Sequence, residues 1–414
     1  MRQRNTLAPM MLIAALITGC SQTTTQGTAH PASTSTAASA VNPTALDPGN
    51  YPTTAQPALG NAGSDHIGRI VEGQRMAGYV VGPWQADATL SVAGSDSPAT
   101  IIETFEHLSH VLWTPIVGGA YNLPLVVGFS SERQTPGPAP QMMLRNAVVR
   151  FADPATATTA AQGMHDRSLH MPRDPRATPI VTAPEQTIPI PGHPEAAGSL
   201  LTFQEANQTV RELNVFTAHG PYVLIQVARC TTSPDCEIPL VAKTLDLQQP
   251  LIDTFTATPA NQFAALPLDP TGLVARTLPL PPDQASSTTG AAYPPAAALH
   301  FDDDPVQTGP ALSAAGVDEV AINLTTVYQA KDPAAGQTLT QTLHDIAAKT
   351  PAAQAAPPVP GLPQSHCTKV AGAGGLVPRY WCLAAASRYT IKAIARQLDK
   401  AHQQITAQYR ILTG

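Results

Sequence analysis

The sequence predicts an α+β protein made of two related antiparallel-sheet-plus-helix units, joined by a Pro-rich linker and preceded by a flexible N-terminal tether. Two observations lead to this prediction. A strand–helix pattern occurs twice, at a constant offset of 179 residues. A stretch dense in Pro, Ala and Thr separates the copies, and this composition is typical of an extended connection.

Each copy of the pattern reads as a strand, an Asp-Pro pair and a helix, at residues 148–166 and again at 327–345. Asp153-Pro154 corresponds to Asp332-Pro333. The pair suits a helix start, because the Asp carboxylate accepts a hydrogen bond from the first turn and Pro has no amide to leave unpaired. We therefore expect Asp153 and Asp332 to be the N-caps of equivalent helices.

A second similarity points the same way. Residues 222–229 resemble residues 389–396, and each segment reads as a strand that leads into a helix, around 240–255 and around 398–412. Apolar residues in the last helix recur at helical spacing. The simplest account is a duplicated unit of strand, helix, two or three antiparallel strands and a second helix, with helices over one face of each sheet.

Three more elements are expected early in the first unit. Residues 78–81 and 123–129 read as short strands. Residues 97–112 read as a helix, because apolar side chains recur at helical spacing and Ser97-Pro98 suits a helix start.

The N-terminus has the three parts of a secretory signal. Arg2 and Arg4 precede an uncharged, mostly apolar run over residues 7–18. That run is too short to cross a bilayer core as a helix, which needs about 20 residues. It ends in Thr18-Gly19-Cys20, which resembles the lipobox of bacterial lipoproteins. We predict cleavage before Cys20 and stable anchoring of the lipidated cysteine to the extracytoplasmic face of the cell membrane.

These features divide the chain into five expected segments. They are a signal peptide at 1–19, the lipidated Cys20 and tether at 20–64, an N-terminal α+β domain at 65–255, a Pro/Ala/Thr-rich linker at 256–312 and a C-terminal α+β domain at 313–414. Cleavage removes two of the 23 basic residues and none of the 29 acidic ones, so the net charge becomes −8. That charge argues against nucleic acid as a partner.

Four cysteines remain besides Cys20, namely Cys230, Cys236, Cys367 and Cys382. An even number in an exported chain favours disulfides. Sequence alone does not choose among the three possible connectivities. One bridge per unit would pair Cys230 with Cys236 and Cys367 with Cys382. Zinc binding is the alternative, and it is disfavoured because neither pair has CxxC spacing.

Two groups of side chains are candidate metal ligands. Glu103, His107 and His110 share one face of the expected helix 97–112, and a carboxylate with two imidazoles suits a metal ion. The same face also reads as the polar, solvated side of that helix, which is the interpretation we favour. His300 with residues 302–304, all Asp, is the densest acidic cluster, but the glycine and terminal glutamate of a calcium loop are missing. We expect a solvated linker end there.

Other patterns are weaker still. His165-Asp166 and His344-Asp345 fall at equivalent ends of the two repeated helices, where the helix dipole favours histidine, so a structural role is expected. The Gly-rich run 372–375 lacks the Lys-Ser/Thr of a phosphate loop and reads as a turn. The sequence contains no GxSxG, SxxK or HExxH pattern, and we expect no cofactor.

Three segments carry a family resemblance: residues 46–53 (LDPGNYPT), 72–77 (EGQRMA) and 404–412 (QITAQYRIL). They resemble an actinobacterial family of secreted lipoproteins, found in mycobacteria and nocardiae, with an N-terminal and a C-terminal domain and no established function. The likeness covers most of the chain after residue 45 and transfers no functional residue. In architecture alone, the units are also similar to the extracellular sensor domain of mycobacterial PknH-type kinases.

Together these observations favour a non-enzymatic lipoprotein that binds a ligand or partner protein of the cell envelope, with the membrane as its anchor. A lipid, a glycan or a neighbouring envelope protein would fit as the ligand. The alternative is a cell-envelope hydrolase or metal-dependent enzyme whose site assembles from distant residues. A cavity that joins several titratable groups with shifted pKa values would favour the alternative, and a convex polar surface would disfavour it.

Overall fold

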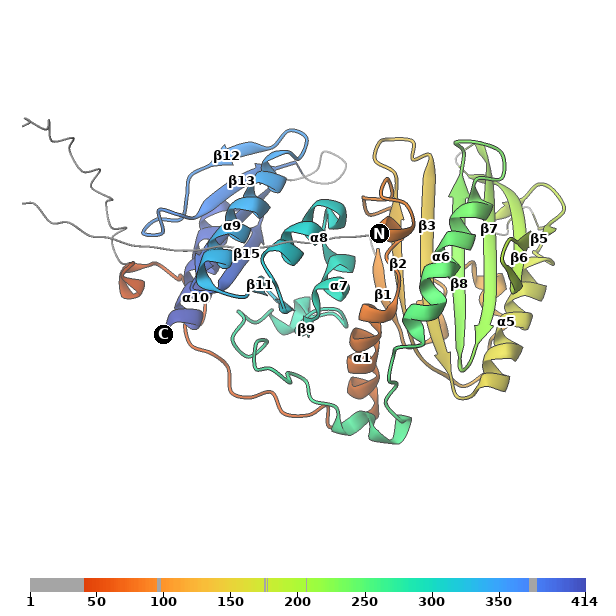
Figure 1. The fold of residues 1–414 in the computed structure, drawn as a ribbon, viewed down its shortest axis with the longest axis horizontal. Coiled ribbons are helices and arrows are strands. Elements are labelled where there is room, and N and C mark those ends of the chain that lie inside the picture. The colour runs from red at the N-terminus through yellow and green to blue at the C-terminus, as the bar shows by residue number, and fades with distance from the viewer. Residues whose placement is uncertain (1–40, 95–97, 175, 177, 206, 372–377) are drawn as a thin grey trace, which may run out of the picture. The chain divides into compact units, whose positions relative to one another are not determined.

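The computed structural model describes residues 41–94, 98–174, 176, 178–205, 207–371 and 378–414 (Figure 1). The expected signal peptide, Cys20 and the first part of the expected tether lie outside these residues, as does the Gly-rich run 372–375.

The first half of the described chain is built on an eight-stranded sheet with the order β1-β2-β3-β8-β7-β6-β4, in which β5 also pairs with β6. Every pairing is antiparallel. The strands are β1 (Ala99–Ile102), β2 (Leu125–Gln134), β3 (Met142–Phe151), β4 (Ile180–Val181), β5 (Gln186–Ile190), β6 (His193–Glu205), β7 (Gln208–His219) and β8 (Tyr222–Cys230).

The second half is built on a seven-stranded antiparallel sheet with the order β12-β13-β14-β15-β11-β10-β9. Its strands are β9 (Ala291–Tyr293), β10 (Glu319–Ile322), β11 (Thr325–Gln329), β12 (Gln354–Ala356), β13 (His366–Val370), β14 (Arg379–Ala386) and β15 (Tyr389–Ala395). The predicted α+β class with two antiparallel sheets is confirmed.

The two sheets repeat one topology. The run β2-β3-β8-β7-β6 in the first corresponds to β10-β11-β15-β14-β13 in the second, with the same connections along the chain. The register agrees as well, because Val148 pairs with Leu224 in the first sheet and Val327 pairs with Ile391 in the second. The duplication predicted from the repeated Asp-Pro pattern is therefore present in strand order and in register.

The repeated helices begin as expected. α5 (Pro154–Ser168) follows β3, and α9 (Pro333–Ala348) follows β11. The Asp153 carboxylate accepts a hydrogen bond from the Thr156 amide at 2.8 Å, and the Asp332 carboxylate accepts one from the Ala335 amide at 2.8 Å. The other helices are α1 (Asp65–Met76), α2 (Pro83–Ala86), α3 (Phe105–Leu108), α4 (Thr114–Val117), α6 (Glu237–Ile252), α7 (Pro295–Ala298), α8 (Pro305–Ala314) and α10 (Leu398–Thr413), with short 3₁₀ turns at Pro43–Ala45, Ala77–Tyr79, Ala260–Ala265, Pro282–Gln284 and Leu299–Phe301.

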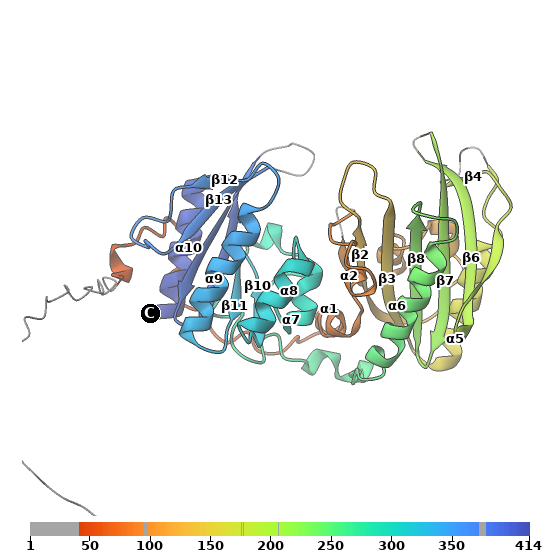
Figure 2. The same cartoon turned by 45° about the horizontal axis from the view of Figure 1, so that its top comes forward.

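Helices cover both faces of each sheet, whereas the sequence suggested one covered face. In the second sheet α9 and α10 lie on opposite faces (Figure 2), and α5 and α6 take the corresponding places in the first. The physical sign is in the strands: β8 is buried at nearly every position instead of at alternate ones. Such continuous burial is expected of a strand packed on both sides.

In each unit, a buried glutamine on the last helix forms an equivalent set of hydrogen bonds. The Gln248 amide, on α6, bonds to the Val81 amide, the Tyr79 carbonyl and the Asn146 side chain. The Gln408 amide, on α10, bonds to the Leu278 amide, the Arg276 carbonyl and the Thr325 hydroxyl. Asn146 and Thr325 hold equivalent strand positions, so each unit uses its last helix to bind the segment that leads into it. This contact also explains why residues 78–81 are a turn and an irregular segment instead of the expected strand.

The stretch 256–312 is not the extended linker that its composition suggested. It contributes β9 to the second sheet, where Ala292 pairs with Ala321, and it contains α7 and the start of α8. Pro295 and Pro305 are the first residues of these helices. Proline is well tolerated at a first helical position, so a proline-rich composition concealed short helices.

The described end of the expected tether, residues 41–64, is likewise packed against the rest of the chain. Leu46 is buried in a cluster with Ile405 of α10. The Gln56 amide bonds to the Ala275 carbonyl at 2.8 Å, and Asn61 forms a bridge with Pro267. These contacts are mostly made by the backbone, and therefore left no apolar periodicity in the sequence.

The expected helix over 97–112 is wrong. Residues 99–102 form β1, in which Ile101 pairs with Phe129 of β2, and only Phe105–Leu108 are α-helical. Thr104 caps that short helix by accepting the His107 amide at 3.2 Å. Because Ile101 and Ile102 are both buried, their adjacent burial fits a two-sided strand better than a one-sided helix. The expected strand near 123–129 is present as the start of β2.

Candidate functional site

A cavity of about 630 Å³ lies between α9 and the sheet face formed by β14 and β15. We call it the α9 cavity. Its apolar walls come mainly from Leu343 and Ile346 of α9 and from Trp381 and Leu383 of β14. Its charged groups are Asp302, Asp303, Asp304, Lys349 and Lys392, and the lining also includes residues 91–93. The volume falls in the range of small-molecule sites.

The strand register explains how a charged residue enters this face. Successive side chains of a strand point to opposite sides, so neighbouring Ile391 and Lys392 of β15 face different layers. Ile391 is fully buried in the cluster beneath α10. Lys392 pairs with Leu383 of β14, and both line the cavity beneath α9.

Lys392 is the positive centre of the site. Its Nζ lies 3.5 Å from Asp302 Oδ2 and 5.6 Å from the centroid of the Trp381 ring. Burial alone would lower the pKa of Lys392, but the Tyr328 hydroxyl and the Asp302 and Asp303 carboxylates raise it above its usual value. Burial also raises the pKa of Tyr328 to about 12. At neutral pH the lysine is therefore charged and the tyrosine is neutral.

The three aspartates differ in their hydrogen-bond partners. Asp302 Oδ1 accepts hydrogen bonds from the Asp304 amide at 3.0 Å and the Thr308 hydroxyl at 2.7 Å. Asp304 caps α8 by accepting the Gln307 amide at 3.1 Å. No donor among the described residues bonds to the Asp303 carboxylate, which is open to the water of the cavity. Desolvation by the surrounding protein nevertheless raises the pKa of Asp303, and the charges of Lys392, Arg133 and Arg379 oppose this shift.

The aspartates are positioned through a buried contact with β2. The Arg133 guanidinium is only 1% exposed and donates to the carbonyls of His300 and Asp302, both at 2.8 Å. Burial lowers the pKa of Arg133, an effect that the nearby aspartates oppose. Its charge lies 5.7 Å from the Trp84 ring. The hydrogen bonds from Arg133 thus hold the backbone at residues 300–302, and residues 302–304 line the cavity.

His300 belongs to this support and not to the cavity. Its Nδ1 lies 2.8 Å from the Ser131 hydroxyl, and its Nε2 lies 3.0 and 3.1 Å from the carbonyls of Ala77 and Val80. Burial, followed by the charge of Arg133, lowers the pKa of His300 to about 3. The ring is neutral, so Nε2 carries the proton and Nδ1 accepts from Ser131. The expectation of a solvated linker end is therefore wrong for His300, which is buried, whereas Asp303 is exposed as expected.

Glu103, His107 and His110 do not form the metal site that a continuous helix would have made. Glu103 Oε2 lies 3.3 Å from Nδ1 of His66 on α1. The His107 ring accepts the Glu103 amide at 3.3 Å, and the His107 and His110 rings are 6.3 Å apart between centroids. The turn at Thr104 separates the three side chains.

The two His-Asp pairs lie in equivalent helices but have different neighbours. Burial lowers the pKa of His165, and its Nδ1 has no hydrogen-bond partner among the described residues. The His344 ring stacks on His366 of β13, with 4.6 Å between centroids. The His344 Nδ1 also lies 3.3 Å from the buried Thr368 hydroxyl, a contact that His165 lacks among the described residues.

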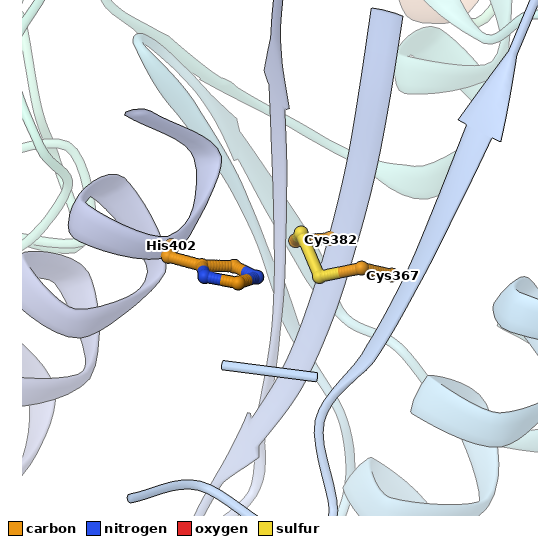
Figure 3. A group of neighbouring side chains, drawn as sticks. All are labelled: Cys367, Cys382 and His402. Carbon is orange, nitrogen blue, oxygen red and sulfur yellow. A yellow bond between two sulfur atoms is a disulfide. The ribbon is translucent and has the colours of Figure 1, made fainter. Parts of the chain in front are cut away.

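The four cysteines form the two local disulfides, Cys230–Cys236 and Cys367–Cys382. The second joins paired residues of β13 and β14 and lies beside His402 of α10, with ligand atoms of the three residues within 4.8 Å of one another (Figure 3). His402 Nε2 is bonded to the Pro357 carbonyl at 3.1 Å. Metal binding needs thiolates, and an intact disulfide supplies none.

Lys392 and Trp381 were not singled out from the sequence. One signal was available: Lys392 is the only charged residue of the run YTIKAIA, which is otherwise suited to a two-sided strand. A charge at an inward position of such a strand marks either a partner or a functional site.

Among the described residues, no helix is long and apolar enough to span a bilayer. No curated protein matches the chain significantly. Among solved structures, the extracellular domain of PknH from Mycobacterium tuberculosis is 13% identical. That match covers 44% of this chain and 96% of the other, with a TM-score of 0.30.

Family comparison covers nearly all of the described chain. Residues 59–268 match the N-terminal domain of unknown function DUF7373, and residues 273–414 match its C-terminal domain. The border between the two matches falls between the two sheets. The chain therefore belongs to the DUF7373 family, a family of domains of unknown function.

Proposed function

We propose that this protein is a lipid-anchored, extracytoplasmic binding protein that holds a small amphipathic ligand in the α9 cavity. The observation that carries the proposal is a cavity with apolar walls and unused polar groups at one end. The Asp303 carboxylate and the buried Trp381 indole N–H have no hydrogen-bond partner among the described residues. A buried N–H is normally paired, so a ligand that offers an acceptor to Trp381 would be favoured.

The proposed location rests on separate features. The lipobox-like Thr18-Gly19-Cys20 supports lipidation, and two disulfides suit an oxidising compartment. In its native host, the Cys20→Ala chain should be exported but should appear in the medium without an acyl label. Retention of the unlabelled variant on the membrane would contradict the anchor.

The binding proposal is tested on the same Cys20→Ala chain, which needs no detergent to keep it soluble. Isothermal titration with decanol, below its solubility limit, should give one site per chain. Ile346→Trp places an indole in the cavity and should abolish binding, because Ile346 lines the wall. Gln337→Trp is the matched control, since Gln337 is exposed on the same helix and should leave binding unchanged.

Two outcomes would count against the binding proposal. If decanol does not bind to the parent chain, the cavity does not act as a site for amphiphiles. If Ile346→Trp binds as the parent does, the ligand lies elsewhere.

A second candidate function is hydrolysis, because the cavity does join several titratable groups with shifted pKa values. The raised pKa of Asp303 suits a general acid. The pKa values of Lys392 and Tyr328 are both raised, so at neutral pH the amine is protonated and the phenol is neutral. Both forms are poor nucleophiles, which disfavours an enzymatic role. Turnover of fluorogenic esters or glycosides that is lost in Asp303→Asn would favour the enzyme over the binding protein.

A further inference from the structure

Charges of both signs in the α9 cavity already have counterparts within the chain. Lys392 Nζ lies 3.5 Å from Asp302 Oδ2. Three positive charges act on the Asp303 carboxylate, namely those of Lys392, Arg133 and Arg379. The cavity therefore contains an internally compensated set of charges.

The two other charged residues of the lining are also accounted for. Asp304 caps α8 by accepting the Gln307 amide, and Lys349 is exposed to water at the end of α9. Neither is a buried charge that a ligand would have to neutralise.

A charged ligand head would consequently meet a like charge in this cavity. An ammonium head would be repelled by Lys392, and a carboxylate head by Asp302 and Asp303. Either head would also leave water for a space with apolar walls, which is costly for an ion without a partner of opposite charge. An uncharged head avoids both penalties.

Trp381 indicates what the uncharged head should offer. Its side chain lines the cavity, and its Nε1 is buried and has no acceptor among the described residues. An indole N–H can only donate, so it is satisfied by an acceptor alone. The carbonyl oxygen of an ester or amide is such an acceptor, and it brings no negative charge toward Asp302.

We infer that the α9 cavity selects an uncharged acyl ester or amide, whose carbonyl oxygen accepts the Trp381 N–H while its hydrocarbon chain lies against Leu343 and Ile346 of α9. This inference rests on the proposed binding function and names the chemical class of its ligand.

The first test compares methyl octanoate, octanoate and octylamine, which at neutral pH carry no charge, a negative charge and a positive charge. Each is titrated calorimetrically into the Cys20→Ala chain, below its limit of solubility and of micelle formation. Methyl octanoate should bind about tenfold more tightly than either charged probe, because only a charged head gives up water without gaining an opposite charge.

Trp381→Phe removes the N–H and keeps an aromatic ring. It should weaken the binding of methyl octanoate about fivefold, within the usual range for one hydrogen bond. Tyr380→Phe is the matched control, because the neighbouring side chain on β14 points to the opposite face and packs in the cluster beneath α10. It should leave the affinity unchanged. Circular dichroism checks that both variants are folded.

A spectroscopic test on the chain with its native tryptophans does not depend on the folding of Trp381→Phe. The protein has three tryptophans, so isotope labelling of the indoles gives three N–H resonances, which Trp84→Phe and Trp113→Phe help to assign. Methyl octanoate should move the Trp381 resonance downfield, as expected when an N–H gains an acceptor. The other two should stay in place, because Trp84 and Trp113 do not line the cavity. Octylamine has no acceptor at neutral pH and should cause no downfield shift.

The outcomes separate the two proposals. If none of the probes binds, the binding function itself fails. If octanoate or octylamine binds as tightly as methyl octanoate, the cavity is a site but its selectivity for an uncharged head is wrong. If methyl octanoate binds without moving the Trp381 resonance, or binds equally well to folded Trp381→Phe, the carbonyl is not recognised by Trp381 and the inference is overturned.

Discussion

The two units differ most at one pair of equivalent positions. In the first unit Ile225 of β8 pairs with Ala147 of β3, and in the second Lys392 of β15 pairs with Thr326 of β11. Ile225 is fully buried in an apolar cluster with residues of α5. Lys392 instead faces the α9 cavity. The two copies therefore differ at this face: the first has an apolar core there, and the second has a charged side chain beside a cavity.

The contacts that close each unit diverged much less. Gln248 and Gln408 are both fully buried, and each bonds to an amide, a carbonyl and a side chain at corresponding places. The two units thus share their architecture and differ at one sheet face, as expected when a functional site is built on one copy of a common scaffold. We therefore expect the buried glutamines to contribute stability, whereas binding at the α9 cavity is the proposed role of the divergent face, and both expectations can be tested.

The largest effect should come from exchanging the divergent pair. Ile225→Lys buries a charge in an apolar cluster and should lower the free energy of unfolding by about 3–5 kcal/mol, the range for an uncompensated buried charge. The reverse change, Lys392→Ile combined with Asp302→Asn, removes both members of an ion pair and should cost less than about 1 kcal/mol. Chemical denaturation measures both. Equal losses would show that the two faces are not differently built.

The glutamine pair should give the next largest effect. Gln248→Leu and Gln408→Leu each remove three hydrogen bonds and leave buried backbone groups unpaired, so each should cost about 3 kcal/mol. Gln249→Leu is the control, because the Gln249 side chain bonds to exposed Glu195 and should matter little. If one of the buried glutamines proved dispensable, the equivalence of the two closures would be lost.

His300 tests the support beneath the cavity. Its pKa falls from 6.5 to about 3 in the folded protein, so the folded state resists the proton that the unfolded chain accepts. The stabilising contribution is therefore complete above pH 6.5 and is lost progressively as the pH falls toward 3. Between pH 6.5 and 5 the loss should be about 2 kcal/mol, at 1.36 kcal/mol per pH unit. Unfolding free energies across this range should fall less steeply in His300→Gln. An unchanged slope would mean that His300 is not buried in its neutral form.

Much of the fold could be predicted because local chemistry specifies it. The Asp153-Pro154 and Asp332-Pro333 pairs favour helix starts by their local chemistry. The constant offset of 179 residues between the two segments predicted the duplication. The region around Pro295 and Pro305 could not be read, because proline marks both a helix start and an extended chain. The site was harder still. Asp302 and Lys392 are 90 residues apart in sequence, and only the order of the strands brings them together.

The N-caps should give the smallest effect and probe the duplication at its simplest. Asp332→Ala removes the carboxylate that accepts the Ala335 amide and should cost about 1 kcal/mol, the usual value for an N-cap. Asp153→Ala should act in the same direction. Asparagine caps nearly as well, so Asp153→Asn and Asp332→Asn are matched controls and should have almost no effect on stability.

Hydrogen bonds from the amide and hydroxyl of Thr156 lower the pKa of Asp153. That cap therefore contributes at neutral pH and is lost as the pH falls through the carboxylate range. Because one apolar cluster contains residues of both units, Val148 and Leu339 among them, either alanine variant should shift a single unfolding transition. Two separate transitions, with each cap affecting only one, would show instead that the units fold independently.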